Sequence, residues 1–223
     1  MAETTTTPAA PRRGARVPGR RGPETREAIH EAALELFAKL GYHATSMRAI
    51  ASAARVQPAA IYHWYPNKEA ILVGLQDEFM ELLTERVEAA MGRQDRPALK
   101  LAAAVREHVA FHGIHRRAAF VTDSEIRALS RRRRDSLVAR RDAYQEIFRE
   151  QIRAGIADRS LRASDADVAT YAILLECTGV ALWFDPRGPL SLDRVAELHV
   201  ELVLGSVGAS AKLIAEAIRA VTE

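Results

Sequence analysis

The sequence predicts an all-α protein of about nine to ten helices, divided into a small N-terminal unit and a larger C-terminal domain. From Glu24 onward, apolar residues recur at steps of three and four, the period of an α-helix with one buried face. No stretch of convincing length alternates apolar and polar residues as a half-buried strand would. Apolar residues make up 48% of the chain and charged residues 27%, which is ordinary for a folded globular protein.

Residues 1–22 are expected to form a disordered basic arm. They are rich in Pro, Gly and Thr and hold five arginines against Glu3, a net charge of +4. Because the whole chain carries only +3, the rest comes to −1, so the charge of the folded part does not by itself indicate nucleic-acid binding. An arginine arm can lie along DNA phosphates or in a minor groove, or it can simply keep the chain in solution, and both interpretations stay open.

Two helices are expected directly after this arm. The first runs from Glu24 to Leu40, and Gly41 is typical of the residue that ends a helix in the left-handed conformation. The second helix has room for barely two turns and is capped by Thr45 or Ser46. Its inward face consists of small and apolar residues that let another helix approach closely: Met47, Ile50, Ala51 and Ala54.

A third helix, Pro58–Trp64, follows a tight turn through Arg55 and Val56. Pro58 stands in the first turn, where its missing N–H costs nothing, and Pro66 ends the helix. Two short helices joined by such a turn form a helix-turn-helix, whose last helix enters the major groove of DNA. We therefore interpret residues 23–68 as a DNA-binding domain.

Outward side chains around the turn are the candidates for contacting DNA. A glutamine amide can pair with adenine and an alanine methyl can pack on a thymine methyl, so the residues expected at base edges are Gln57, Pro58, Ala59, Ala60 and His63. The residues expected at phosphate oxygens are Thr45, Ser46, Tyr62 and Lys68. Arg48, on the outer face of the second helix, can reach either a phosphate or a base.

The stretch GYHATSMRAIASAARVQPAAIYHWYPNKEAIL resembles the DNA-binding domain of the TetR family of bacterial regulators. The shared residues are Gly41, Thr45, Ile50, Ala51, Ala54, Val56, Ile61, Tyr62, Pro66, Lys68 and Glu69. This resemblance implies a homodimer, a two-fold symmetric operator and, usually, repression that a ligand relieves. The family usually has glycine where Arg55 stands, so we expect either that Arg55 accepts a positive φ at a cost of about 1 kcal/mol or that the turn is reshaped.

The remaining chain, residues 69–223, is predicted to be a helical domain for ligand binding and dimerisation. Asn67 caps a long fourth helix from Lys68 to about Met91. The further segments expected to be helical are Pro97–Arg116, a short piece near Ser124–Leu129, Arg133–Gly155, Asp165–Phe184, Ser191–Ser206 and Ser210–Val221.

The segment Asp165–Phe184 is apolar on two faces, so it must be covered on two sides. One face contains Ile173, Leu174, Cys177 and Val180, and the other contains Val168, Tyr171, Leu175 and Leu182. A second subunit is expected to cover one of them, with Ser191–Ser206 as the partner helix of a four-helix interface. The residues assigned to this interface are Val168, Gly179, Leu182, Leu198 and Leu202; the alternative is a core helix of a monomer.

An effector site in such a domain is expected to be an apolar tunnel with a few polar groups. The candidate lining residues are Phe111, Phe120, Tyr144, Phe148, Tyr171, Leu175, Thr178 and Trp183, each of which can instead be a plain core residue. Parts of this domain resemble, less specifically, TetR-family members that sense acyl-CoA thioesters or related lipids. Under that resemblance, Arg140, Arg141 or Arg187 attracts an anionic head group.

Three histidines, His108, His112 and His115, share one helix face at a spacing that invites a metal hypothesis. No cysteine or carboxylate partner stands beside them on that face, so polarity within a ligand pocket and plain packing are the alternatives. Neither a metal nor a cofactor is assigned. The single cysteine, Cys177, lies in an apolar run and is read as a core residue.

Two other classes of function compete with a regulator. An enzyme is disfavoured because the chain has no Gly-rich phosphate loop, nucleophile elbow or metal-ligand signature, so no catalytic residue is assigned. A sequence-tolerant architectural DNA-binding protein is the other alternative. No stretch reaches about 18 uncharged apolar residues and no secretory signal is evident, so we expect a cytoplasmic protein. Its expected partners are double-stranded operator DNA, a small hydrophobic effector and a second copy of the chain, but no membrane.

Overall fold

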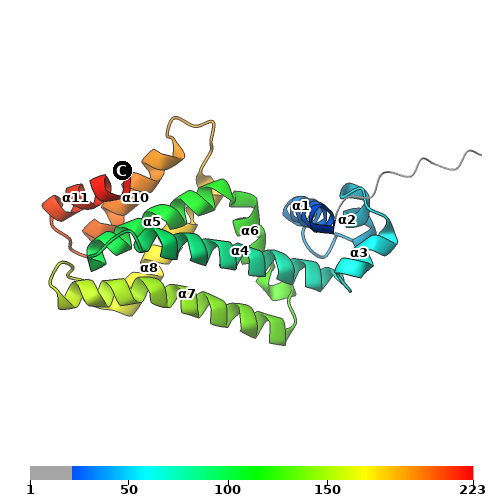
Figure 1. The fold of residues 1–223 in the computed structure, drawn as a ribbon, viewed down its shortest axis with the longest axis horizontal. Coiled ribbons are helices and arrows are strands. Elements are labelled where there is room, and N and C mark those ends of the chain that lie inside the picture. The colour runs from blue at the N-terminus through cyan, green and yellow to red at the C-terminus, as the bar shows by residue number, and fades with distance from the viewer. Residues whose placement is uncertain (1–21, 223) are drawn as a thin grey trace, which may run out of the picture.

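The structure, a computed structural model, describes residues 22–222, and over these residues it contains helices and turns but no strand (Figure 1). The predicted all-α class is confirmed. The basic arm expected over residues 1–22 lies outside the described residues, apart from Gly22. Figure 1 shows α1 to α3 gathered at one end of the molecule, with α4 running from them along the other helices.

The N-terminal unit consists of α1 (Gly22–Leu40), α2 (Met47–Ala53) and α3 (Pro58–Trp64). Ser46 caps α2, since its side-chain oxygen accepts a hydrogen bond from the Ala49 amide at 3.1 Å. Both turns need a left-handed residue: φ is +81° at Gly41 and +56° at Arg55, as the sequence predicts. The buried side chains that join the three helices include Ile29, Phe37, Ile50 and Ile61.

The C-terminal helices are α4 (Lys68–Met91), α5 (Pro97–Ile114), α6 (Arg116–Ser124), α7 (Arg131–Ala157), α8 (Ala166–Thr178), α9 (Val180–Trp183), α10 (Leu192–Ser206) and α11 (Ala211–Thr222), with the 3₁₀ turn η1 (Glu125–Ala128) after α6. Helix α5 is the centre of this domain and packs against α4, α7, α8, α10 and α11. Gly113 permits the contact with α10, because a β-carbon there would lie 2.2 Å from Leu192 Cδ1.

Two expected helices are interrupted in the structure. The helix expected to end at Arg116 ends at Ile114, and a separate helix, α6, starts after His115, whose backbone is not helical (φ −97°, ψ 32°). Residues 117–123 were expected to lie outside a helix, although Ala118, Ala119 and Val121 follow the apolar period that indicates one. The run expected to be continuous from Asp165 to Phe184 is likewise divided at Gly179 into α8 and the single turn α9.

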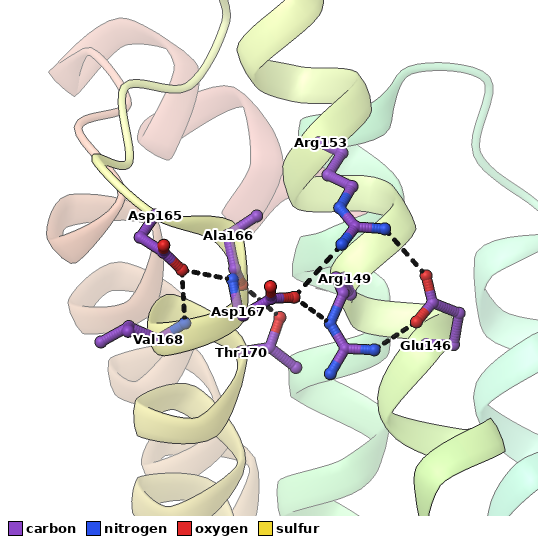
Figure 2. Close-up of polar contacts among 8 residues, drawn as sticks. All are labelled: Glu146, Arg149, Arg153, Asp165, Ala166, Asp167, Val168 and Thr170. Carbon is purple, nitrogen blue, oxygen red and sulfur yellow. Dashed lines mark hydrogen bonds and ion pairs between the residues drawn. The ribbon is translucent and has the colours of Figure 1, made fainter.

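A network of charged side chains fixes the start of α8 on α7 (Figure 2). The Asp167 carboxylate forms an ion pair with Arg149 Nε at 2.6 Å and accepts a hydrogen bond from Arg153 at 3.2 Å, and both arginines also pair with Glu146. Asp165 caps α8 by accepting from the amides of Asp167 and Val168. A network of linked ion pairs fixes the relative position of two helices more firmly than a single exposed ion pair does. They therefore set how α8 lies beside α7, where the cavity described below opens.

Candidate functional site

The outer face of α3 carries most of the residues expected at base edges. Gln57, Pro58, Ala59 and His63 are exposed and Ala60 is partly exposed, while Ile61 is fully buried against the other two helices. Tyr62 is 55% exposed, which leaves its hydroxyl free to reach a phosphate. The placement of these side chains agrees with the expected contacts, whose roles stay predictions.

Two further residues expected at phosphates, Ser46 and Arg48, are also exposed. The Ser46 oxygen accepts from the Ala49 amide, so its own proton remains available to a phosphate oxygen. Arg48 lies on α2 and its guanidinium has no ion-pair partner among residues 22–222. Both side chains can therefore approach a DNA backbone without breaking an internal contact.

Thr45 and Lys68 lie differently from the expectation. Thr45 is buried, and its hydroxyl lies 2.9 Å from the Gly41 carbonyl oxygen and 3.3 Å from that of Leu36. Lys68 Nζ donates to the carbonyl oxygens of Tyr42 and Thr45, both at 2.6 Å, and lies 4.3 Å from the centre of the Tyr42 ring. Both side chains thus hold the loop between α1 and α2, and their phosphate contacts stay predictions.

A relay of three side chains, the buried Tyr65 and His30 and the exposed Glu78, joins the N-terminal unit to α4. Tyr65 and the Nε2 atom of His30 are 2.5 Å apart, and His30 Nδ1 lies 2.8 Å from Glu78. Because a carboxylate only accepts, Nδ1 carries the proton and the Tyr65 hydroxyl donates to Nε2. Burial lowers the pKa of His30, while Glu78 acts in the opposite direction. Gly74 leaves room for this contact, since a β-carbon there would lie 3.2 Å from His30 Nε2.

Helix α6 and η1 form a second connection to the N-terminal unit. Glu125 accepts a hydrogen bond from the Tyr42 amide at 3.2 Å, and Glu69 accepts one from the Ser130 amide at 2.7 Å. Tyr42 is the residue whose carbonyl oxygen accepts from Lys68. The loop between α1 and α2 is therefore held from α4 and from η1 together.

A cavity of about 440 Å³ lies between α4, α5, α7 and α8. Its apolar lining comes from Phe79, Met80, Leu83, Tyr171, Leu174 and Leu175, and its polar lining from His108, His112, Asp123, Arg141, Tyr144, Gln145 and Thr178. Leu175 is 79% exposed, so the cavity opens to the surface beside α8. This combination of an apolar body with a few polar groups is typical of a small-molecule site.

The sequence identified part of this lining. Tyr144, Tyr171, Leu175 and Thr178 line the cavity, but Phe111 and Phe148 are buried in the core and are not among its lining residues. Two predicted lining residues lie outside the cavity: Phe120 borders a groove beside α6 and α9, and Trp183 stacks on His199. The α4 residues were missed, although Phe79 and Leu83 belong to the apolar face that periodicity assigns to this helix.

Two histidines form the polar edge of the cavity. The rings of His108 and His112 stack with their centres 4.1 Å apart, and His108 lies 2.7 Å from the Tyr144 hydroxyl and 3.1 Å from that of Thr178. Burial lowers the pKa of His112 to about 4 and that of His108 in the same direction, so both rings are neutral at pH 7. Within residues 22–222, no group of three or more His, Cys, Asp or Glu side chains is arranged to hold a metal ion.

The charged residues of the cavity compensate one another. Arg141 donates to the Asp123 carboxylate at 2.7 Å and to the carbonyl oxygen of Thr122 at 3.0 Å. Burial raises the pKa of Asp123, and Arg141 opposes that shift.

A larger hollow of about 860 Å³ lies outside, between α4 and α7; it shares Met80 and Tyr144 with the cavity. Its other walls include carboxylates on successive turns of α4: Glu81, Glu85 and Glu88.

The surface of α8, α9 and α10 carries a set of exposed apolar side chains, here called the apolar face: Val168, Tyr171, Leu175, Leu182, Trp183 and Leu202. Leu182 is 76% exposed, whereas Ile173, Cys177 and Val180 on the opposite side are buried. The sequence predicted this division of the two faces. Of the other residues assigned to a subunit interface, Gly179 and Leu198 are partly exposed.

The same apolar composition passes a simple test for a membrane span. By length and composition alone, the stretch Ala166–Trp183 could cross a bilayer, and 22% of it is buried. A single stretch of this kind is weak evidence for a membrane span. In the structure this stretch is two helices rather than one, and Asp167 near its start is paired with two arginines. Its exposed side chains need a cover, which a second protein surface supplies as well as lipid does.

Two family models match the chain. The one described as tetracyclin repressor-like, C-terminal domain, matches residues 94–207, and the one described as bacterial regulatory proteins, tetR family, matches residues 29–75. The HTH-type transcriptional repressor KstR2 of Rhodococcus jostii strain RHA1 is 30% identical over 185 residues, which cover 80% of this chain and 89% of that protein.

Solved structures agree with this similarity over the whole fold. A bacterial regulatory protein in the tetR family from Rhodococcus RHA1 superposes with a TM-score of 0.79 at 28% identity, covering 83% of this chain and 98% of that one. The regulator AibR, solved in complex with isovaleryl coenzyme A and operator DNA, superposes with a TM-score of 0.74 at 26% identity, covering 81% of this chain and 98% of that one.

Proposed function

The chain belongs to the TetR family of bacterial regulatory proteins, and from that membership we propose that it is a repressor which a small hydrophobic effector releases from its operator. It is a DNA-binding transcriptional regulator and not an enzyme. The observation that carries the proposal is the presence, in one chain, of an exposed recognition helix and a cavity with a buried polar edge.

Residues 23–68 are the proposed DNA-binding domain and residues 69–223 the proposed effector and dimerisation domain. Gln57, Pro58, Ala59, Ala60 and His63 face base edges, and the phosphate contacts come from Ser46, Tyr62 and Arg48. Their exposure on α2 and α3 supports these roles. Phosphate contacts fix how the unit lies on DNA, while the side chains at the start of α3 read the sequence.

The effector occupies the cavity between α4, α5, α7 and α8. Its apolar lining supports a hydrophobic ligand, and AibR, a structural neighbour, was solved with isovaleryl coenzyme A. We therefore propose an acyl-CoA or a related lipid as the effector class. The volume of about 440 Å³ is within the usual range for small-molecule sites and fits the acyl part of such a compound.

A second copy of the chain covers the apolar face. A contiguous apolar surface on a soluble regulator is normally buried in an interface, and a two-fold operator requires two copies of α3. We propose that the protein acts in the cytoplasm, where its DNA is, and that a second copy of the chain rather than a membrane covers the apolar stretch Ala166–Trp183.

The contacts of α6 and α4 provide the route from the effector to DNA. Arg141 holds α6 through Thr122 and Asp123, η1 holds the Tyr42 amide through Glu125, and α4 holds the Tyr42 carbonyl through Lys68. An effector that displaces α6 or α4 therefore moves the N-terminal unit and changes the separation of the two recognition helices. They must lie about 34 to 36 Å apart to enter successive major grooves. The coupling is reciprocal, so the operator weakens effector binding by the same factor.

The test is the affinity of the full chain for the duplex flanking its own gene, compared with a shuffled duplex at two salt concentrations. A preference of about a thousandfold or more is expected, because specific regulators exceed their non-specific affinity by at least this much. Gln57→Ala and Tyr62→Ala should each reduce it, whereas Gln151→Ala on α7 is the matched control outside the DNA-binding unit. Equal binding that depends only on salt would instead identify the architectural alternative.

A further inference from the structure

The polar edge of the cavity includes one ring nitrogen without a protein partner. His112 is almost fully buried and lines the cavity, and its Nδ1 atom lies 2.9 Å from the carbonyl oxygen of His108 in its own helix. A carbonyl oxygen only accepts hydrogen bonds, so Nδ1 is the nitrogen that carries the proton. The other nitrogen, Nε2, is therefore an acceptor with a free lone pair, and no hydrogen bond joins it to any residue in the described range 22–222.

The surroundings of His112 hold this acceptor in place. The ring stacks on His108 at 4.1 Å and meets the edge of Phe79, whose ring centre is 5.5 Å away. Burial keeps the pKa of His112 at about 4, so Nε2 stays unprotonated at pH 7. Because this nitrogen borders the cavity, a ligand that supplies a donor adds one hydrogen bond there on binding.

The nature of the donor follows from the charges nearby. A carboxylate cannot donate. An ammonium group would meet Arg141, and Asp123, the only carboxylate among the described residues that line the cavity, is already paired with that arginine. An amide N–H brings a carbonyl group that needs a second donor, such as Gln145, placed at the right distance, whereas a hydroxyl needs only the one contact. A neutral hydroxyl donates to Nε2 without adding charge, and the remainder of the ligand then contacts apolar side chains such as Leu83 and Leu174.

We infer that the part of the effector inside this cavity is an apolar skeleton bearing a hydroxyl group, which donates a hydrogen bond to Nε2 of His112. The inference rests on the proposed effector cavity and specifies the class of compound that it takes. An acyl chain with a hydroxyl substituent or a free apolar alcohol satisfies it, and an unsubstituted hydrocarbon chain does not.

The test uses two probes with the same number of heavy atoms, 1-decanol and methyl nonyl ether. Calorimetric titration of the full chain without DNA should give an alcohol affinity about tenfold higher than that of the ether, the difference expected for one buried hydrogen bond. The ¹⁵N resonance of His112 Nε2 should shift with the alcohol only. This shift reports the hydrogen bond itself, independently of changes in packing.

Three variants make the test specific. His112→Phe removes the acceptor and should bring the affinity ratio to about one, while His112→Gln keeps a side-chain acceptor and should retain part of the preference. His199→Phe is the matched control, because His199 Nδ1 also bonds to a carbonyl of its own helix, at 2.8 Å, but the residue does not line the cavity. It should keep the tenfold ratio.

Equal affinities of the two probes for the unmodified chain, an unchanged ratio in His112→Phe, or no binding of either probe up to its solubility would each overturn the inference. The outcome is separate from that of the proposed function. Failure to bind any operator duplex would refute the repressor while leaving the hydroxyl preference intact. Operator binding without that preference would refute only the inference about the effector.

Discussion

Replacing Arg55 with glycine is expected to stabilise the protein by relieving backbone strain in the turn of the helix-turn-helix. Arg55 has φ +56°, its side chain is exposed, and its guanidinium makes no ion pair among residues 22–222. The left-handed conformation costs a non-glycine residue about 1 to 2 kcal/mol. Glycine in turn lowers stability by about 0.4 to 1 kcal/mol, because it gives the unfolded chain more conformational freedom. Taken between the middles of these two ranges, the net gain in the free energy of unfolding is about 0.8 kcal/mol.

The measurement is reversible urea unfolding of the full chain, supported by the thermal midpoint, which should rise by about 1 to 4 °C. Arg159→Gly is the matched control, because Arg159 has φ +65° at an exposed position after α7 and should show a gain of similar size. Ala53→Gly, in the right-handed helix α2, should instead lose about 1 kcal/mol. A loss of stability in Arg55→Gly alongside a gain in Arg159→Gly would show that Arg55 is not strained.

Three further predictions concern the interface, the relay and pH. Leu182→Asp should give a monomer in sedimentation and lower operator affinity, since it introduces a charge into the apolar face; Leu190→Asp, also at an exposed leucine but outside that face, should leave a dimer. Tyr65→Phe should lower the free energy of unfolding by about 1 to 3 kcal/mol, because it leaves His30 Nε2 without its donor, and Tyr62→Phe should not. The folded-state pKa of His112, about 4, lies below the usual 6.5, so the unfolded chain binds the extra proton first and stability falls as pH drops from about 6.5 toward 4. Each pH unit in that window costs up to about 1.4 kcal/mol, and unfolding titrations of His112→Phe should lack that part of the loss.

Local signals in the sequence were sufficient for several elements. Helix α3 begins at Pro58, and α4 extends from Lys68 to Met91, as predicted, because proline, the Asn67 cap and Gly92 act within a few residues. The assignment of Leu182 to an exposed face was also possible from sequence, since periodicity records which side chains share a side of a helix.

What the sequence could not reveal depends on contacts between distant residues. Lysine commonly binds phosphates, which is why Lys68 was expected to do so. The carbonyl oxygens of Tyr42 and Thr45 reach its ammonium group only after α1 and α2 have packed. The partner of Asp123 was equally hidden, because Arg141 reaches it from another helix. Periodicity likewise recognised Phe148 as apolar without distinguishing a core position from a cavity wall.

The way out of the cavity limits where a charged end of an effector can lie. Among the described residues, the hollow between α4 and α7 is lined by three carboxylates, Glu81, Glu85 and Glu88, and by one cation, Arg140, which is already paired with Asp77. The carboxylates outnumber the cation and repel the phosphates of a coenzyme A thioester. The other opening passes Tyr171 and Leu175, which also belong to the apolar face. A large effector therefore leaves the cavity beside the proposed subunit interface, and the second copy touches residues that the effector also touches. Effector affinity should consequently depend on the extent of dimerisation, because the same two side chains take part in both contacts.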